Sequence, residues 1–158
     1  MTDKKQNEEA VSAPLNLDPF KSVDKAEMKV LSAAGEPTGW VWTIAGPGHP
    51  NTIALEDEIL DKSLEEGRAK EAARVNGKKY KPPHKTSEDI RRENAEAAAS
   101  RVLGWKPDTV TLSGETLKFS KESVVKALRD PDYGGELTRQ LTEFFKSEDS
   151  FSGRSGKK

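Results

Sequence analysis

The runs Met28-Lys29-Val30-Leu31 and Trp40-Val41-Trp42-Thr43-Ile44 decide the fold of this chain. Both are rich in β-branched, aromatic or large apolar residues, which favour strands. The residues between them, 33–39, read AAGEPTG and contain the Gly and Pro that are typical of turns. We therefore expect an antiparallel hairpin. In the second strand Trp40, Trp42 and Ile44 alternate onto one face, which needs a covering layer.

After this hairpin the sequence turns helical. The loop 46–50 reads GPGHP and leads out of the sheet, because its prolines have no backbone N–H to donate. Over 52–74 the side chains of Ile53, Leu60 and Leu64 recur at helical spacing, with Leu55 and Ile59 widening the stripe. Residues 56–66 hold six acidic residues and one lysine, whereas 67–85 hold seven basic residues and one glutamate. This order complements a helix dipole, but the basic excess beyond the end of the helix needs another reason.

The second half of the chain predicts mostly helix. Asn76-Gly77 ends the first helix, and Thr86-Ser87 caps an Ala-rich one that we expect to run through Val102-Leu103 and stop at Gly104. A short hairpin is expected over 110–119, followed by a helix capped by Ser120 and a last helix after Gly135.

These elements predict an α+β fold with a small antiparallel β-sheet near the N-terminus, packed by helices, and a mostly helical C-terminal half. We expect one domain over 23–147, with a basic loop at 76–86. The polar residues 1–22 and 148–158 predict a disordered N-terminal tail and a flexible C-terminal tail.

The composition limits the classes of function. The 158 residues are 34% charged and 33% hydrophobic, with a mean hydropathy of −0.81, which leaves material for one modest core. A net charge of −1 argues against a dedicated nucleic-acid or membrane binder. The absence of cysteine excludes disulfides and suits a reducing cytoplasm. From the polar start we expect no signal peptide, and no apolar run in the sequence is long enough to span a bilayer.

Catalytic and metal motifs are missing from the sequence. His49 and His84 both lie beside prolines in loops, 35 positions apart, which does not predict a metal site. There is no Gly-rich phosphate loop, no nucleophile elbow and no His-Glu-x-x-His, and the carboxylates fall on predicted helix faces. We expect a binding protein that needs no cofactor, and not an enzyme.

Two groups of residues are candidates for binding. The first is a basic patch in which three lysines surround one aromatic ring, namely Lys78, Lys79, Tyr80 and Lys81. It offers phosphate contacts and one stacking ring, although a solvated loop between two helices has the same composition. The second is an apolar stripe on the last helix together with one indole, namely Leu137, Leu141, Phe144, Phe145 and Trp105. These side chains either close a small core or contact a partner protein, because both roles need an apolar face.

The order of motifs along 31–151 resembles a known family. Val102-Leu103-Gly104-Trp105 precedes the second hairpin, which runs into Leu117-Lys118-Phe119-Ser120-Lys121-Glu122-Ser123 and then Ala127-Leu128-Arg129-Asp130-Pro131. A helix with Gln140-Leu141 and a late Phe151 follow. This order is similar to the tail assembly chaperones of long-tailed, siphovirus-like bacteriophages, in which a Gly-Trp precedes a hairpin, a Phe-Ser/Thr-x-Glu helix start and a Leu-x-x-Pro stop. The basic loop 78–85 departs from that pattern.

The resemblance implies a chaperone that binds the tape measure protein in the host cell cytoplasm. Such a protein keeps its long helical partner soluble until subunits of the tail tube protein polymerise around it, and it is absent from the mature virion. Weak contacts that are repeated many times suit displacement by the tube subunits, and they favour self-association. Two alternatives stay open: a structural head or tail accessory protein of the virion, and a small nucleic-acid-associated accessory protein.

The family also suggests how the chain ends. Many members are made in a short and a longer form by ribosomal frameshifting. The last residues, Gly156-Lys157-Lys158, can be encoded as GGA-AAA-AAG, which contains an A-rich slippery heptamer. We therefore expect either the short form of such a pair or simply a flexible basic tail.

Overall fold

A computed structural model describes residues 13–18, 23–147 and 151 of the chain. The predicted tails, 1–22 and 148–158, fall largely outside these residues. The elements in chain order are β1 (Lys25–Leu31), β2 (Pro37–Ala45), α1 (Pro50–Val75), α2 (Ser87–Ser100), β3 (Val102–Lys106), β4 (Thr109–Leu112), β5 (Glu115–Lys118), α3 (Lys121–Arg129) and α4 (Gly134–Lys146). The α+β fold is confirmed, with a small antiparallel sheet near the N-terminus packed by helices.

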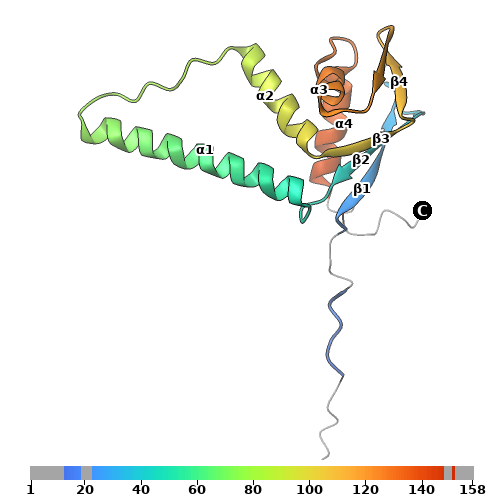
Figure 1. Ribbon diagram of the computed structural model, residues 1–158, viewed down its shortest axis with the longest axis horizontal. Helices are drawn as coiled ribbons and strands as arrows, with labels where there is room; N and C mark the ends of the chain where they lie inside the picture. The colour runs from blue at the N-terminus through green and yellow to red at the C-terminus, as the bar shows by residue number, and fades with distance from the viewer. Residues whose placement is uncertain (1–12, 19–22, 148–150, 152–158) are drawn as a thin grey trace, which may run out of the picture.

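The larger sheet has three antiparallel strands in the order β1-β2-β3, so the predicted hairpin is confirmed (Figure 1). Met28 of β1 and Trp105 of β3 both lie opposite Trp42 of the central strand. Trp42 and Ile44 are fully buried, whereas Trp40 is half-buried nearer the turn. The alternation read from the sequence therefore marks the face that packs on the helices.

The third strand corrects the expected length of the Ala-rich helix. That helix ends at Ser100 with Arg101 as its C-cap, and Val102–Lys106 forms β3. The prediction that it continues through Val102-Leu103 is wrong. Pairing with β2 satisfies backbone groups on that edge of the hairpin and buries Val102 and Trp105, which a longer helix would not achieve.

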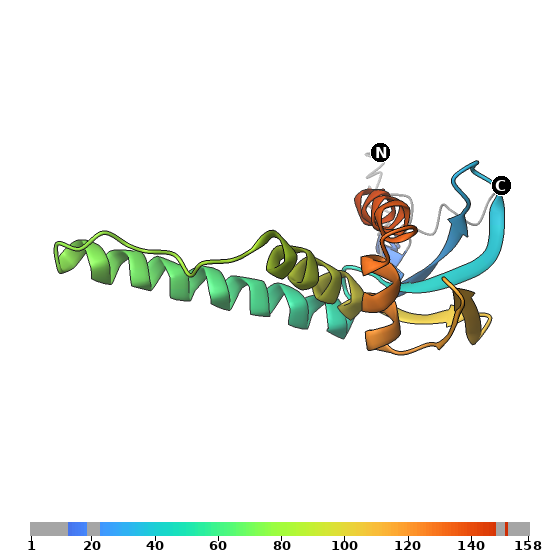
Figure 2. The same ribbon diagram turned by 90° about the horizontal axis from the view of Figure 1, so that it is seen from above.

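The helix α1 and residues 76–86, which form neither helix nor strand, make up a segment that we call the arm. The arm extends away from the sheet, and its second part returns to the start of α2 (Figures 1 and 2). The base of the arm is fixed where the Thr52 hydroxyl donates to the Gly46 carbonyl at 2.8 Å. Thr86 caps α2 as predicted, and the side chain of Asp89 accepts a hydrogen bond from the backbone N–H of Thr86.

The core joins the sheet to α2, α3 and α4, with Leu117 of the second hairpin also buried. Its largest fully buried side chains are Trp42, Ile44, Leu141 and Val124. Residues from both halves of the chain share this one cluster, so the larger sheet and the C-terminal helices pack as a unit.

The start of α4 is held by a close backbone approach. A Cβ added at Gly134 would lie 2.3 Å from the carbonyl oxygen of Leu128. Only glycine fits at that position, and it allows the chain to turn from α3 directly into α4.

Candidate functional site

The predicted apolar stripe of α4 lies mostly inside the protein. Leu137 and Leu141 are 4% and 1% exposed, and Trp105 on β3 is 4% exposed. These three side chains belong to the core, which is the first of the two roles that their apolar spacing allowed, and they are not open to a partner. The reason is that the sheet and α3 supply apolar partners within the same chain.

Phe144 and Phe145 are half-buried at the end of the same helix. The ring of Phe144 packs edge-on against Phe151 at 5.4 Å, and the Arg101 guanidinium lies 4.0 Å from the ring centre of Phe145. Phe151, which we expected in the flexible tail, is buried. Burial lowers the pKa of Arg101, whose guanidinium also donates to the Ala45 carbonyl at 2.9 Å.

The predicted basic patch lies on the returning part of the arm. Lys78, Lys79 and Lys81 are exposed, as expected of a solvated loop. Tyr80 is half-buried, and the ammonium of Lys70 lies 5.5 Å from the centre of its ring. The patch therefore presents three lysines to solvent, while its one aromatic ring already has a cation against it.

An apolar cleft that the sequence did not indicate lies between the hairpin, β4 and α4. It has a volume of about 690 Å³, and we call it the hairpin cleft. The large apolar side chains lining it come from four elements, β1, β2, β4 and α4: Val30, Leu31, Trp40, Val110, Leu112 and Leu137. No single stretch of sequence contains this site. Its only local signal is the alternation of apolar residues in β1 and β4, which also fits an ordinary strand.

Hydrogen bonds from α4 hold the hairpin side of this cleft in place. The amide of Gln140 accepts from the backbone N–H of Leu31 at 2.9 Å and donates to its carbonyl at 2.8 Å. These bonds lie at the point where the β1–β2 register shifts, between Lys29 and Leu31. The position of α4 and the end of β1 are thus set together.

One edge of the hairpin cleft is acidic. Asp132 and Glu136 line it beside the apolar residues. Hydrogen bonds from the Arg139 guanidinium and then from the Gln140 amide lower the pKa of Glu136 to about 2. Glu136 is therefore ionised at neutral pH, and the cleft combines an apolar surface with a carboxylate that is already paired.

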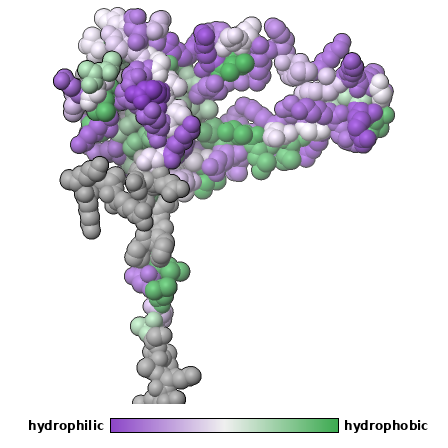
Figure 3. Space-filling view, turned by 180° about the vertical axis from the view of Figure 1, so that it is seen from behind, coloured by the Kyte–Doolittle hydropathy of each residue, from purple (hydrophilic) through white to green (hydrophobic). Residues whose placement is uncertain are grey.

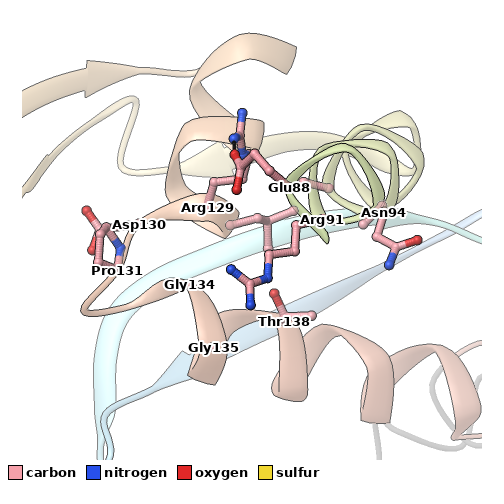
Figure 4. Close-up of a pocket in the computed structure, with 12 residues that line it drawn as sticks. Glu88, Arg91, Asn94, Arg129, Asp130, Pro131, Gly134, Gly135 and Thr138 are labelled. Atoms are coloured by element: carbon pink, nitrogen blue, oxygen red, sulfur yellow. Dashed lines mark ion pairs between the residues drawn. The ribbon is translucent and has the colours of Figure 1, made fainter. Parts of the chain in front are cut away.

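A second, polar cleft of about 630 Å³ lies between α2, α3 and α4. Figure 4 shows Arg91 extending from α2 toward Thr138 of α4, and Glu88 of α2 paired with Arg129 of α3. This ion pair bridges two helices at the surface, where salt bridges contribute little to stability. The mixture of charged and small residues makes this cleft less suited to an apolar partner than the hairpin cleft.

Neither histidine lines the hairpin cleft or the polar cleft. His49 is the N-cap of α1, where its Nδ1 accepts from the backbone N–H of Asn51 at 3.1 Å, and His84 lies on the returning part of the arm. Within residues 13–18, 23–147 and 151, no three His, Cys, Asp or Glu side chains gather as a metal site. In the same residues, no helix is both long and apolar enough to cross a membrane.

No protein-family model, curated protein or solved structure matches this chain.

Proposed function

We propose that this chain is a phage tail assembly chaperone, a binding protein without catalytic activity that keeps the tape measure protein soluble and helps to recruit tail tube subunits. The hairpin cleft carries the proposal. Its volume of about 690 Å³ lies within the range of ligand-binding clefts. An amphipathic helix presents such side chains along one face, and it docks by laying that face into an apolar groove.

Two further features support this function. The motif order along 31–151 is similar to that of the chaperone family. The cleft is built from strands and a helix that are fixed by hydrogen bonds, so binding requires little ordering of the chaperone itself. A protein that is 34% charged stays soluble while its apolar cleft is empty. A shallow apolar contact also binds its partner weakly, which suits release to arriving tube subunits.

The proposal is tested by co-expressing the chain with helical segments of the tape measure protein of the same phage and measuring the soluble fraction of the segment. Leu31→Glu and Leu112→Glu each place a charge in the hairpin cleft. Leu31 is already 38% exposed, so the first variant should fold. We expect each variant to reduce the soluble fraction strongly, because a carboxylate in an apolar contact must be desolvated.

Leu15→Glu is the matched control, since Leu15 is 82% exposed and lies outside the cleft. It should leave the soluble fraction unchanged. The proposal is overturned if the soluble fraction of the tape measure segment is the same with the wild-type chain, with the cleft variants and with no chain present. Recovery of the chain from purified particles by mass spectrometry would favour a virion accessory protein. Salt-sensitive DNA binding that is lost on neutralising Lys78, Lys79 and Lys81 would favour a nucleic-acid-associated protein.

A further inference from the structure

The arm carries a row of apolar side chains that nothing else in the described residues covers. Within α1 only Thr52 is buried, although the helix has 26 residues and is therefore about 39 Å long. Ile53, Leu60, Leu64 and Val75 are 46%, 57%, 50% and 73% exposed. Figure 3 shows hydrophobic residues along the arm, set between hydrophilic ones. A helix this long with its large apolar residues in solvent lacks the covering layer that amphipathic helices normally have.

These residues form one stripe on the side of α1 that faces away from the rest of the protein. At about 100° per residue, the four side chains and Gly67 fall within roughly 80° around the helix axis. The residues that face the body at the base of α1, which include Ala54, Leu55 and Glu58, lie roughly 100–200° around from Ile53. The stripe is therefore free to meet another molecule without disturbing the base of the arm.

The spacing of the stripe is symmetric about Leu64. Ile53 and Val75 each lie eleven residues from it, on opposite sides. If a second copy of α1 packs antiparallel with Leu64 against Leu64, Ile53 of one copy is level with Val75 of the other. Leu60 is then within one residue of the level of Gly67, whose missing side chain leaves room for it. A Cβ added at Gly67 would meet nothing within 4 Å in the chain itself, so the fold of one copy does not require this glycine.

The charges beside the stripe select the antiparallel direction. On one side of it, Arg68 lies between the levels of Asp57 and Asp61 of the second copy when Leu64 faces Leu64. On the other side, Glu56 is level with Lys70 and Arg74 of the second copy. Twofold symmetry repeats both sets of opposite charges.

A parallel pair would instead place each of these residues beside its own copy, which brings like charges together. Glu71, which lies on the stripe and becomes level with Asp57 of the second copy, keeps the Arg74 of its own helix as a partner at 2.6 Å.

We propose that the chain forms a homodimer in which the α1 helices of two copies pair antiparallel through the stripe Ile53, Leu60, Leu64, Gly67 and Val75. The pairing covers the apolar face of the arm and joins its acidic first half to the basic second half of the other copy. The dimer carries two hairpin clefts, so a partner with repeated apolar segments is held at two points. The dimer is inferred from the arm alone and does not depend on the proposed chaperone function.

Disulfide cross-linking of the full-length chain tests both the contact and its direction. The chain has no cysteine, so single cysteines introduced at exposed positions report only the new contacts. Leu64→Cys should cross-link to itself under mild oxidation. Ile53→Cys and Val75→Cys should cross-link to each other when the two variants are mixed, and much less when either is alone. Leu15→Cys, at a position that is 82% exposed, gives the background. Self-linking of Val75→Cys, or no linking above this background, would overturn the proposal.

Charge reversal gives a second, independent test by light scattering. The wild-type chain should have twice the chain mass of 17.4 kDa. Arg68→Glu alone, or Asp57→Lys with Asp61→Lys, should weaken dimerisation by about tenfold, because each creates like-charge contacts twice. Mixing these two variants restores opposite charges at both places, so the mixture should return to the dimer mass. A mixture that stays monomeric, or a wild-type chain that is monomeric at all concentrations, would refute the antiparallel pair whatever the tape measure experiment shows.

Discussion

Replacing Gln140 by Ala removes the side chain that ties α4 to the end of β1. The wild-type amide makes two hydrogen bonds to the backbone of Leu31, at 2.9 and 2.8 Å, and Gln140 is 9% exposed. Each such bond contributes about 0.5–1.5 kcal/mol net. Leu31 is 38% exposed, so water reaches the freed backbone groups and limits the penalty. We therefore expect a loss of about 2 kcal/mol in the free energy of unfolding, or about 8 °C in Tm.

Urea unfolding followed by circular dichroism measures this loss, and Thr142→Ala is the control on the same helix. The Thr142 hydroxyl is exposed and bonds only the Thr138 carbonyl one turn earlier, so its removal should change stability by less than about 0.5 kcal/mol. Gln140→Glu sharpens the test. It keeps the acceptor for the Leu31 N–H but turns a second acceptor toward the Leu31 carbonyl and Glu136, so it should destabilise the protein more than Ala at neutral pH. If Gln140→Ala costs no more than Thr142→Ala, the assigned role of Gln140 is wrong.

Three further predictions concern stability. Gly134→Ala should lower the free energy of unfolding in urea by about 2 kcal/mol, because its Cβ would lie 2.3 Å from a backbone oxygen. Gly135→Ala, whose Cβ would meet nothing within 4 Å, should be neutral or stabilising. The reverse order of stabilities would contradict the close approach at Gly134. Thr86→Ala removes the α2 cap and should cost about 1 kcal/mol, seen also as faster amide exchange in the first turn. Glu136 has a pKa of about 2 in the folded state against its usual 4.5, so its contribution to the free energy of unfolding is present above pH 4.5 and is lost as the pH falls toward 2. Glu136→Gln should therefore reduce the loss of stability between pH 4.5 and 2. An unchanged loss would argue against the pairing with Arg139.

The sequence indicated the elements best where local chemistry dictates them. The first hairpin follows from alternating Trp and Ile residues around a Gly-Pro turn, and the caps at Thr86 and Ser120 are both present. The end of α2 was missed because Ala residues continue a helix without marking a boundary. The strand that begins at Val102 is fixed by pairing with β2, which is a tertiary effect that local propensity does not contain.

The candidate site was harder to predict, because amphipathic spacing shows which face of a helix is apolar but not what covers it. The stripes on α1 and α4 have similar spacing, yet Leu141 is 1% exposed and Leu64 is 50% exposed. The difference arises because α4 packs on β1 and α3 whereas most of α1 extends beyond them. The hairpin cleft was missed for a related reason, since its walls meet only after the chain has folded.

The binding of a purified tape measure segment to the hairpin cleft is the most direct test of the proposed chaperone role. Isothermal titration of a helical, apolar segment into the wild-type chain should show saturable binding with a negative heat-capacity change, which marks burial of apolar surface. Leu112→Glu should weaken that binding by at least about tenfold, because it places a charge in the contact, and Leu15→Glu should leave it unchanged. Binding that is equally strong in Leu112→Glu, or no binding by the wild-type chain to any segment, would contradict the role proposed for the hairpin cleft.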